Sequence, residues 1–156
     1  MTNTLKIGDK APAFAMPTGG GGKTSLKSLK GQTIVLYFYP KDLTPGCTKE
    51  AIAFSEHIKA FDKAGAVVIG TSKDPVSRHD KFKEKHSLSI ILGSDEDGHV
   101  SEDYGVWVQK SMYGRKFMGL ERSTFLIDGK GVICQIWRKV KVNGHIEEVL
   151  AAVQAL

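Results

Sequence analysis

The most constraining feature of the sequence is an unbroken run of six apolar and aromatic residues, Ile34 to Tyr39. A strand with one face in water alternates apolar and polar residues, whereas this run presents no strongly polar side chain on either face. We therefore expect a buried strand inside a sheet that is covered on both sides. The rest of the chain has to supply that cover.

The other expected elements follow this strand in a regular order. The glycine-rich patch Gly19 to Gly22 predicts the turn of an N-terminal β-hairpin. After the buried strand, the pattern predicts a helix over about 45–63, a strand over 66–71 and a polar helix over 74–86 that is opened by an Asp74 N-cap and Pro75. A strand over 90–92, a short helix near Tyr104 and an irregular stretch over 105–119 follow. The last expected elements are strands over 123–127 and 132–137, joined by a tight hairpin, and an amphipathic helix from about His145. This order implies an α/β fold that is thioredoxin-like, with a mixed central sheet flanked by helices.

Size and charge narrow the class of protein. The 156 residues, 41% of them hydrophobic, suit one domain over residues 1–156. Met1 to Asp9 contains no apolar run of signal-peptide length, and no later stretch approaches the roughly 18 apolar residues of a membrane span. We therefore expect a cytoplasmic protein with no membrane partner. The net charge of +5 comes from lysines scattered among acidic residues, which favours a solvated basic surface over nucleic-acid binding.

The segment between the buried strand and the first long helix carries the candidate chemistry. Thr44 can be the N-cap and Pro45 the first helical residue, which places Cys47 in the first turn. Backbone N–H groups and the helix dipole favour a thiolate there. Complete ionisation gains at most ~30-fold, because a free thiol with a pKa of ~8.5 is already ~3% ionised at pH 7. Further donors are needed, and Thr44 and Arg122, directly before the strand 123–127, are the candidates.

The same residues resemble the active-site motif of a known family. Pro40, Thr44 and Cys47 form a Pro-x-x-x-Thr-x-x-Cys pattern similar to that of peroxiredoxins, and Arg122 precedes a Thr-Phe-Leu-Ile-Asp strand as that family's active-site arginine does. The stretches 37–42, 104–107 and 110–116 resemble the bacterioferritin comigratory protein subfamily, also called peroxiredoxin Q. The resemblance extends over essentially the whole chain.

This resemblance implies a thiol-dependent peroxidase that reduces hydrogen peroxide and small organic hydroperoxides. Cys47 is then the peroxidatic cysteine that becomes a sulfenic acid, Thr44 a hydroxyl ligand of peroxide and thiolate, Arg122 the electrostatic stabiliser, and Pro40 a shield against water. No cofactor and no metal are implied, and the five histidines lack the spacing of metal ligands. Members of the subfamily are often monomers or dimers, so a monomer or weak dimer is expected.

The chain departs from the subfamily in its second cysteine. Many members of the subfamily carry a resolving cysteine, which traps the sulfenic acid, either five residues after the peroxidatic cysteine or in the next helix. In this chain the first of these positions is Ile52, and the helix 74–86 contains no cysteine. This points to a 1-Cys cycle completed by an outside thiol such as thioredoxin, glutaredoxin or glutathione. Cys134 lies in an apolar strand and is expected to be a packed core thiol, with resolution of Cys47 as the alternative.

Other interpretations of these residues remain open at this stage. Thr44 can be an N-cap alone, Cys47 a structural cysteine on the apolar helix face of Ala51, and Arg122 a solvated residue. Glu50 either orients Arg122 or is an exposed acid favoured near a helix start. Rival functions are a thiol–disulfide exchanger, which the missing CxxC motif disfavours, and a non-enzymatic basic binding or holdase module. Two short motifs, a partial phosphate loop over 22–24 and a partial calcium loop over 95–98, lack the context that either site requires.

Overall fold

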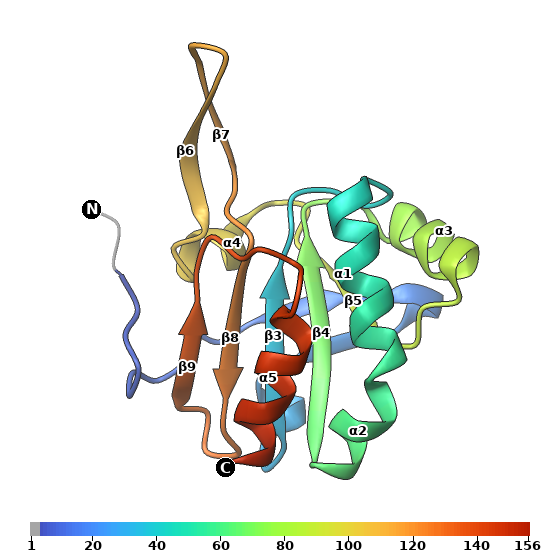
Figure 1. Ribbon diagram of the computed structural model, residues 1–156, viewed down its shortest axis with the longest axis vertical. Helices are drawn as coiled ribbons and strands as arrows, with labels where there is room; N and C mark the ends of the chain where they lie inside the picture. Colours follow the sequence, from blue (N-terminus) through green and yellow to red (C-terminus); the bar gives the residue numbers. More distant parts are fainter. Residues whose placement is uncertain (1–3) are drawn as a thin grey trace.

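A five-stranded mixed sheet forms the centre of the molecule. The computed structural model describes residues 4–156, so residues 1–3 of the stretch Met1 to Asp9, where the sequence predicts no signal peptide, lie outside the described residues. In the order β5-β4-β3-β8-β9, the strands are β5 (Ile91–Ser94), β4 (Ala66–Ser72), β3 (Thr33–Phe38), β8 (Ser123–Ile127) and β9 (Ile133–Trp137). The first three run parallel, while β8 is antiparallel to β3 and β9 to β8 (Figure 1).

The central strand β3 is buried on both faces, as its composition predicts. Alternate side chains enter two separate apolar clusters, Val35, Tyr37 and Tyr39 in one and Ile34, Leu36 and Phe38 in the other. All six are at most 1% exposed. The absence of polar residues from this run therefore reflects two covered faces.

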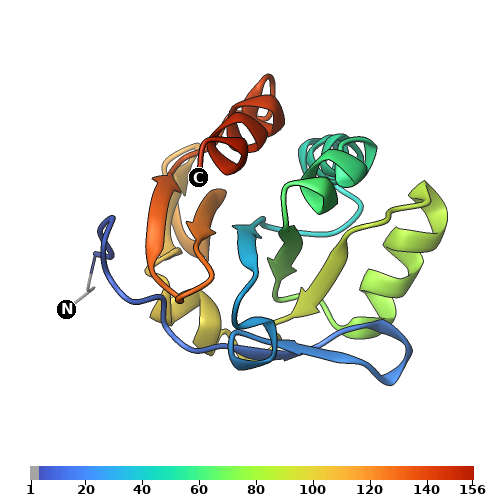
Figure 2. The same ribbon diagram turned by 90° about the horizontal axis from the view of Figure 1, so that it is seen from below.

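Helices cover one face of the sheet and smaller elements cover the other (Figures 1 and 2). The first cluster contains side chains from α1 (Pro45–Glu56), α2 (Ile58–Lys63), α3 (Val76–His86) and α5 (His145–Gln154). The second contains side chains from α4 (His99–Asp103) and from β1 (Ala15–Pro17) of the N-terminal hairpin. In this hairpin β1 pairs with β2 (Lys23–Ser25), the 3-10 turn η1 (Gly19–Gly21) lies between the two strands, and η2 (Lys27–Leu29) follows. The thioredoxin-like mixed sheet and the hairpin are confirmed. No helix within 4–156 has both the length and the apolarity to cross a bilayer.

The stretch 105–119 is regular, so the prediction of an irregular segment there is wrong. It contains the antiparallel hairpin of β6 (Trp107–Met112) and β7 (Arg115–Leu120), which protrudes from the body in Figure 1. Tyr113 and Gly114 form its two-residue turn, both with positive φ. Most of the ribbon is exposed on both faces, so the apolar–polar alternation that identifies a half-buried strand is absent.

Two of the expected helices also have bounds that differ from the prediction. Pro75 is the N-cap of α3 rather than its first helical residue, and Asp74 makes no cap hydrogen bond. The Asp74 carboxylate instead accepts from the hydroxyl of Ser72 at 2.7 Å and from the backbone N–H of Asp42 at 2.8 Å. The expected helix over 45–63 is interrupted at His57, where a ring nitrogen lies 2.8 Å from the Ala53 carbonyl and competes with the helical ladder.

We expect Phe125→Ala to lower the free energy of unfolding by about 3–5 kcal/mol, because removal of the ring leaves a cavity in a closely packed core. Phe125 is fully buried, with its ring centroid 5.1 Å from that of Tyr104 and 5.8 Å from that of Phe38. Urea unfolding measures the loss. Phe117→Ala on the protruding hairpin, where the side chain is 43% exposed, is the matched control and should change stability by less than about 1 kcal/mol. Similar losses in both variants would contradict this assignment of the core.

Candidate active site

Sheet topology brings Cys47 and Arg122 together from distant parts of the chain. Phe38 at the end of β3 is the register partner of Ser123 at the start of β8, because these neighbouring strands are antiparallel. The loop after β3 leads into α1, and Arg122 directly precedes β8. The start of α1 and Arg122 therefore meet at one edge of the sheet, where open α/β sheets commonly carry binding sites.

The sulfur of Cys47 lies in the first turn of α1 and is in contact with Arg122. Pro45 opens the helix after the N-cap Thr44, so Cys47 is its third residue, as predicted. Nη2 of Arg122 donates to Sγ of Cys47 at 3.3 Å, and Cys47 is only 2% exposed. The close approach also explains Gly46, since a Cβ there would lie 3.2 Å from Nη2 of Arg122. The interpretations of Arg122 as a freely solvated residue and of Cys47 as a thiol in purely apolar packing do not fit this contact.

Glu50 is the partner that orients Arg122. Nη1 of Arg122 donates to Oε1 of Glu50 at 2.5 Å, and the Glu50 carboxylate is fully buried. The alternative of an exposed acid is therefore wrong. Burial raises the pKa of Glu50 to about 7, although the adjacent guanidinium favours the charged carboxylate. Burial opposes the charge on Arg122, but Glu50 and Cys47 outweigh it and raise the Arg122 pKa above its ordinary value.

Two further groups belong to the electrostatic surroundings of this site. Tyr37 is fully buried, and its pKa is raised well above the ordinary value by burial first and then by Glu50 and Cys47. Its hydroxyl has no hydrogen-bond partner within 4–156, and Oε2 of Glu50 has none there either. Lys110 on β6 has its pKa lowered by partial burial and by Arg122, with Cys47 opposing. Lys110, in the middle of β6, is therefore a further cation in the electrostatic surroundings of Cys47, which the sequence alone did not indicate.

Thr44 occupies the N-cap position but does not cap the helix with its side chain. Its backbone is extended and its carbonyl accepts from the N–H of Thr48 at 2.9 Å. The predicted N-cap position is therefore confirmed, but the hydroxyl makes no capping hydrogen bond and instead donates to the carbonyl of Lys41 at 2.7 Å. The loop carbonyl competes for the hydroxyl proton, and the oxygen keeps lone pairs for another donor. Pro40, at the start of the same loop, is exposed.

Cys134 is separate from this site. It is half-buried on β9, where its thiol lies 3.6 Å from the carbonyl of Val132, and both cysteines are free. Burial and the nearby Asp128 raise the Cys134 pKa, which disfavours the reactive thiolate. The environment fits a packed strand residue.

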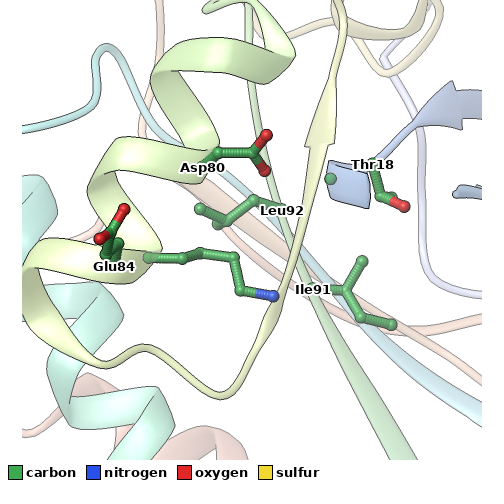
Figure 3. Close-up of a pocket in the computed structure, with 7 residues that line it drawn as sticks. Thr18, Asp80, Glu84, Ile91 and Leu92 are labelled. Carbon is green, nitrogen blue, oxygen red and sulfur yellow. The ribbon is translucent and has the colours of Figure 1, made fainter. Parts of the chain in front are cut away.

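A surface cavity and the acidic turn at 95–98 both lie apart from the Cys47 site. A surface cavity of about 430 Å³ lies between α3 and the N-terminal hairpin, and its lining includes Thr18, Asp80 and Ile91 but none of the predicted site residues (Figure 3). The turn at 95–98 is present, and the Asp95 carboxylate there accepts from the backbone N–H groups of Val100 and Ser101 at the start of α4.

Comparison with known proteins agrees with this geometry. Residues 7–136 match the AhpC/TSA family. A putative peroxiredoxin Bcp of Coxiella burnetii is 52% identical over 94% of this chain and 97% of its own length, and peroxiredoxin Bcp of Bacillus subtilis is 47% identical over 94% of each chain. The structure of the Xanthomonas campestris bacterioferritin comigratory protein has a TM-score of 0.87 at 44% identity, covering 91% of this chain and 90% of that one.

Relatives this similar across nearly the whole of both chains, together with a thiol and a guanidinium in contact at the start of α1, identify the group. The chain belongs to the AhpC/TSA family and, within it, to the peroxiredoxins of the Bcp or peroxiredoxin Q type, which are thiol-dependent peroxidases.

Proposed function

We propose that this peroxiredoxin reduces hydrogen peroxide and small organic hydroperoxides through Cys47 in a 1-Cys cycle. The Cys47 thiolate donates an electron pair to one peroxide oxygen, the O–O bond breaks, and the other oxygen leaves as hydroxide or alkoxide. That oxygen takes a proton and departs as water or an alcohol, while Cys47 becomes a sulfenic acid. An external thiol then forms a mixed disulfide with Cys47 and releases water, and a second thiol frees Cys47.

The observation that carries the proposal is the 3.3 Å contact between Nη2 of Arg122 and Sγ of Cys47. A guanidinium at this distance places a fixed positive charge against the sulfur. It also offers a donor to the negative charge that develops as the O–O bond breaks, in a site largely closed to water. The second guanidinium nitrogen is held by the buried Glu50, so Arg122 does not have to be ordered during the reaction.

The remaining loop residues have supporting roles in this proposal. The Thr44 hydroxyl donates to Lys41, and its free lone pairs accept a hydrogen bond from a peroxide O–H. Pro40, whose backbone nitrogen has no N–H to bind water, lies at the start of the loop and limits access of water to Cys47.

The relatives and the two cysteines support the choice of substrate and reductant in this proposal. The Xanthomonas campestris relative was studied for alkyl peroxide reduction, which supports organic hydroperoxides as substrates here. Since Cys134 is free and packed in β9, the reductant in this cycle is an outside thiol such as thioredoxin, glutaredoxin or glutathione. A cytoplasmic monomer or weak dimer with no cofactor and no nucleic-acid or membrane partner completes the proposal.

The first test replaces Arg122. We expect Arg122→Ala to lower kcat/KM for hydrogen peroxide by about 10²–10³-fold, because it removes a donor to the departing oxygen. Loss of the thiolate alone accounts for at most about 30-fold at pH 7. Stopped-flow peroxide consumption and the ultraviolet absorbance of the thiolate measure the two effects separately.

The controls for this test are a matched arginine and the thiol itself. Arg138 is also partly buried and paired with a carboxylate, Glu121, at 2.8 Å, and Arg138→Ala should retain most of the activity. Cys47→Ser should have none. Equal losses of rate and of thiolate in Arg122→Ala would remove the transition-state role, and full peroxidase activity in Cys47→Ser would rule out Cys47 as the reacting thiol.

The second test concerns the fate of the oxidised thiol. Because no internal thiol traps the sulfenic acid in this cycle, excess hydrogen peroxide should convert Cys47 to sulfinic acid, seen as a gain of two oxygens in intact mass. Cys134→Ser should behave like the wild type. A loss of two hydrogens from a Cys47–Cys134 disulfide, absent from Cys134→Ser, would refute the 1-Cys cycle.

The third test uses the buried carboxylate of Glu50. Between pH 4.5 and about 7 the folded protein keeps a proton on Glu50 that the unfolded chain has lost, so the contribution of Glu50 to stability falls as pH rises. Relative to Glu50→Gln, the wild type should therefore lose on the order of 2–3 kcal/mol of unfolding free energy from pH 4.5 to 8. Urea unfolding across this range measures it. Glu147→Gln, with an exposed side chain, is the control; parallel curves for wild type and Glu50→Gln would contradict the assignment.

A further inference from the structure

A second buried polar cluster lies on the loop that leads to Cys47, outside the site described above. Asp42 belongs to this loop and is fully buried, as is His79 of α3 at 1% exposure. Oδ2 of Asp42 lies 2.5 Å from Nδ1 of His79, and Oδ1 of Asp42 accepts from the hydroxyl of Tyr39. The thiol chemistry does not use any of these three groups.

Asp42 is held at all of its polar groups. Besides the two carboxylate contacts, its backbone N–H donates to Oδ2 of Asp74 at 2.8 Å, and its carbonyl accepts from Nη2 of Arg78 at 3.4 Å. These partners come from α3 and from the segment before it. The loop 40–44, which leads into the first turn of α1 and Cys47, is thereby attached to α3.

The protons of the pair follow from what each ring nitrogen faces. Nε2 of His79 lies 3.0 Å from the carbonyl of Gly93, which can only accept, so Nε2 carries a proton. Nδ1 shares a hydrogen bond with the Asp42 carboxylate at 2.5 Å, so each buried polar atom of the pair has a partner. Since both Asp42 oxygens are used by His79 and Tyr39, this cluster is a closed hydrogen-bond network rather than a set of open metal ligands.

The loop next to this network is strained. Leu43 has a φ of 64°, a left-handed conformation that is costly for a residue with a branched side chain. Such a conformation persists where the surroundings determine it. The fixed Asp42 on one side and the Thr44 hydroxyl bonded to Lys41 on the other supply that constraint.

We propose that Asp42 and His79 are positioning residues whose buried contact holds the loop 40–44 closed, keeping Thr44 and Cys47 in the peroxide-reducing geometry. This inference rests on the function proposed above. Because Cys47 is only 2% exposed, an external thiol reaches its sulfur only when this loop or the first turn of α1 opens. The network therefore favours attack on peroxide and opposes reaction with the reductant, so its loss should move the two steps in opposite directions.

The test measures opening without peroxide, by alkylation of Cys47 with iodoacetamide in a Cys134→Ser background. The pH midpoint of alkylation reports ionisation, and the plateau rate reports access to the sulfur. In Asp42→Ala we expect the plateau to rise about tenfold or more and kcat/KM for hydrogen peroxide to fall about tenfold or more. His79→Ala should behave likewise, and the double variant should add little, because both changes remove the same contact.

A conservative variant and a matched control separate positioning from general stability. In Asp42→Asn the amide can donate to Nδ1 of a neutral His79 and accept from Tyr39, so alkylation and turnover should stay within about threefold of the wild type. Asp95→Ala removes another buried carboxylate, which anchors the start of α4, and should lower stability while leaving Cys47 alkylation unchanged. If Asp42→Ala does not fold, Tyr39→Phe removes one hydroxyl from the network and should raise the plateau about threefold.

Unchanged alkylation in the network variants, or an equal rise in Asp95→Ala, would overturn the proposal. A wild-type protein that consumes no peroxide would refute the peroxidase function and leave the alkylation result to stand separately, so the two failures are distinguishable.

Discussion

The contact between Arg122 and the sulfur of Cys47 is the interaction on which the chemistry depends, and the sheet topology creates it. β8 lies antiparallel beside β3, so its first residue meets the last residue of β3. The residue before β8 is therefore placed beside the helix that follows β3. A parallel strand in this position would begin at the opposite edge of the sheet, far from Cys47. The mixed sheet thus has a direct chemical consequence.

The chain carries a buried carboxylate before Cys47 and another after it, and each is paired with a basic side chain. Glu50 faces Arg122, and Asp42 faces His79; both carboxylates are fully buried. Burying an unpaired charge is costly, so neither carboxylate is favourable for stability without its partner. The raised pKa of Glu50 records part of that cost. In this account the two pairs give a defined geometry around one sulfur at the expense of some stability.

Much of the framework could be predicted from local patterns. The run Ile34 to Tyr39 predicted a strand with two covered faces, and Thr44 and Pro45 predicted the helix start that places Cys47 in the first turn. Arg122 was predicted as its partner because it precedes a strong strand pattern. These signals are local, and it was the resemblance to peroxiredoxins that assigned Cys47 and Arg122 to one site.

The features that were missed depend on contacts between distant segments or on exposure. Glu50 was left undecided, because an acid near a helix start has the same local signal whether it is exposed or paired with Arg122. Asp42 and His79 are 37 residues apart and meet only through the packing of α3. The hairpin over 107–120 escaped detection because both of its faces are largely exposed and its turn has Tyr113 where asparagine is more usual.

The most direct measurement of the central claim is the fate of one equivalent of hydrogen peroxide added to the reduced protein with dimedone present. The account predicts that one peroxide is consumed per chain and that the dimedone adduct of a sulfenic acid lies on the peptide carrying Cys47. An adduct on Cys134, or peroxide left unconsumed while Cys47 stays reduced, would contradict it.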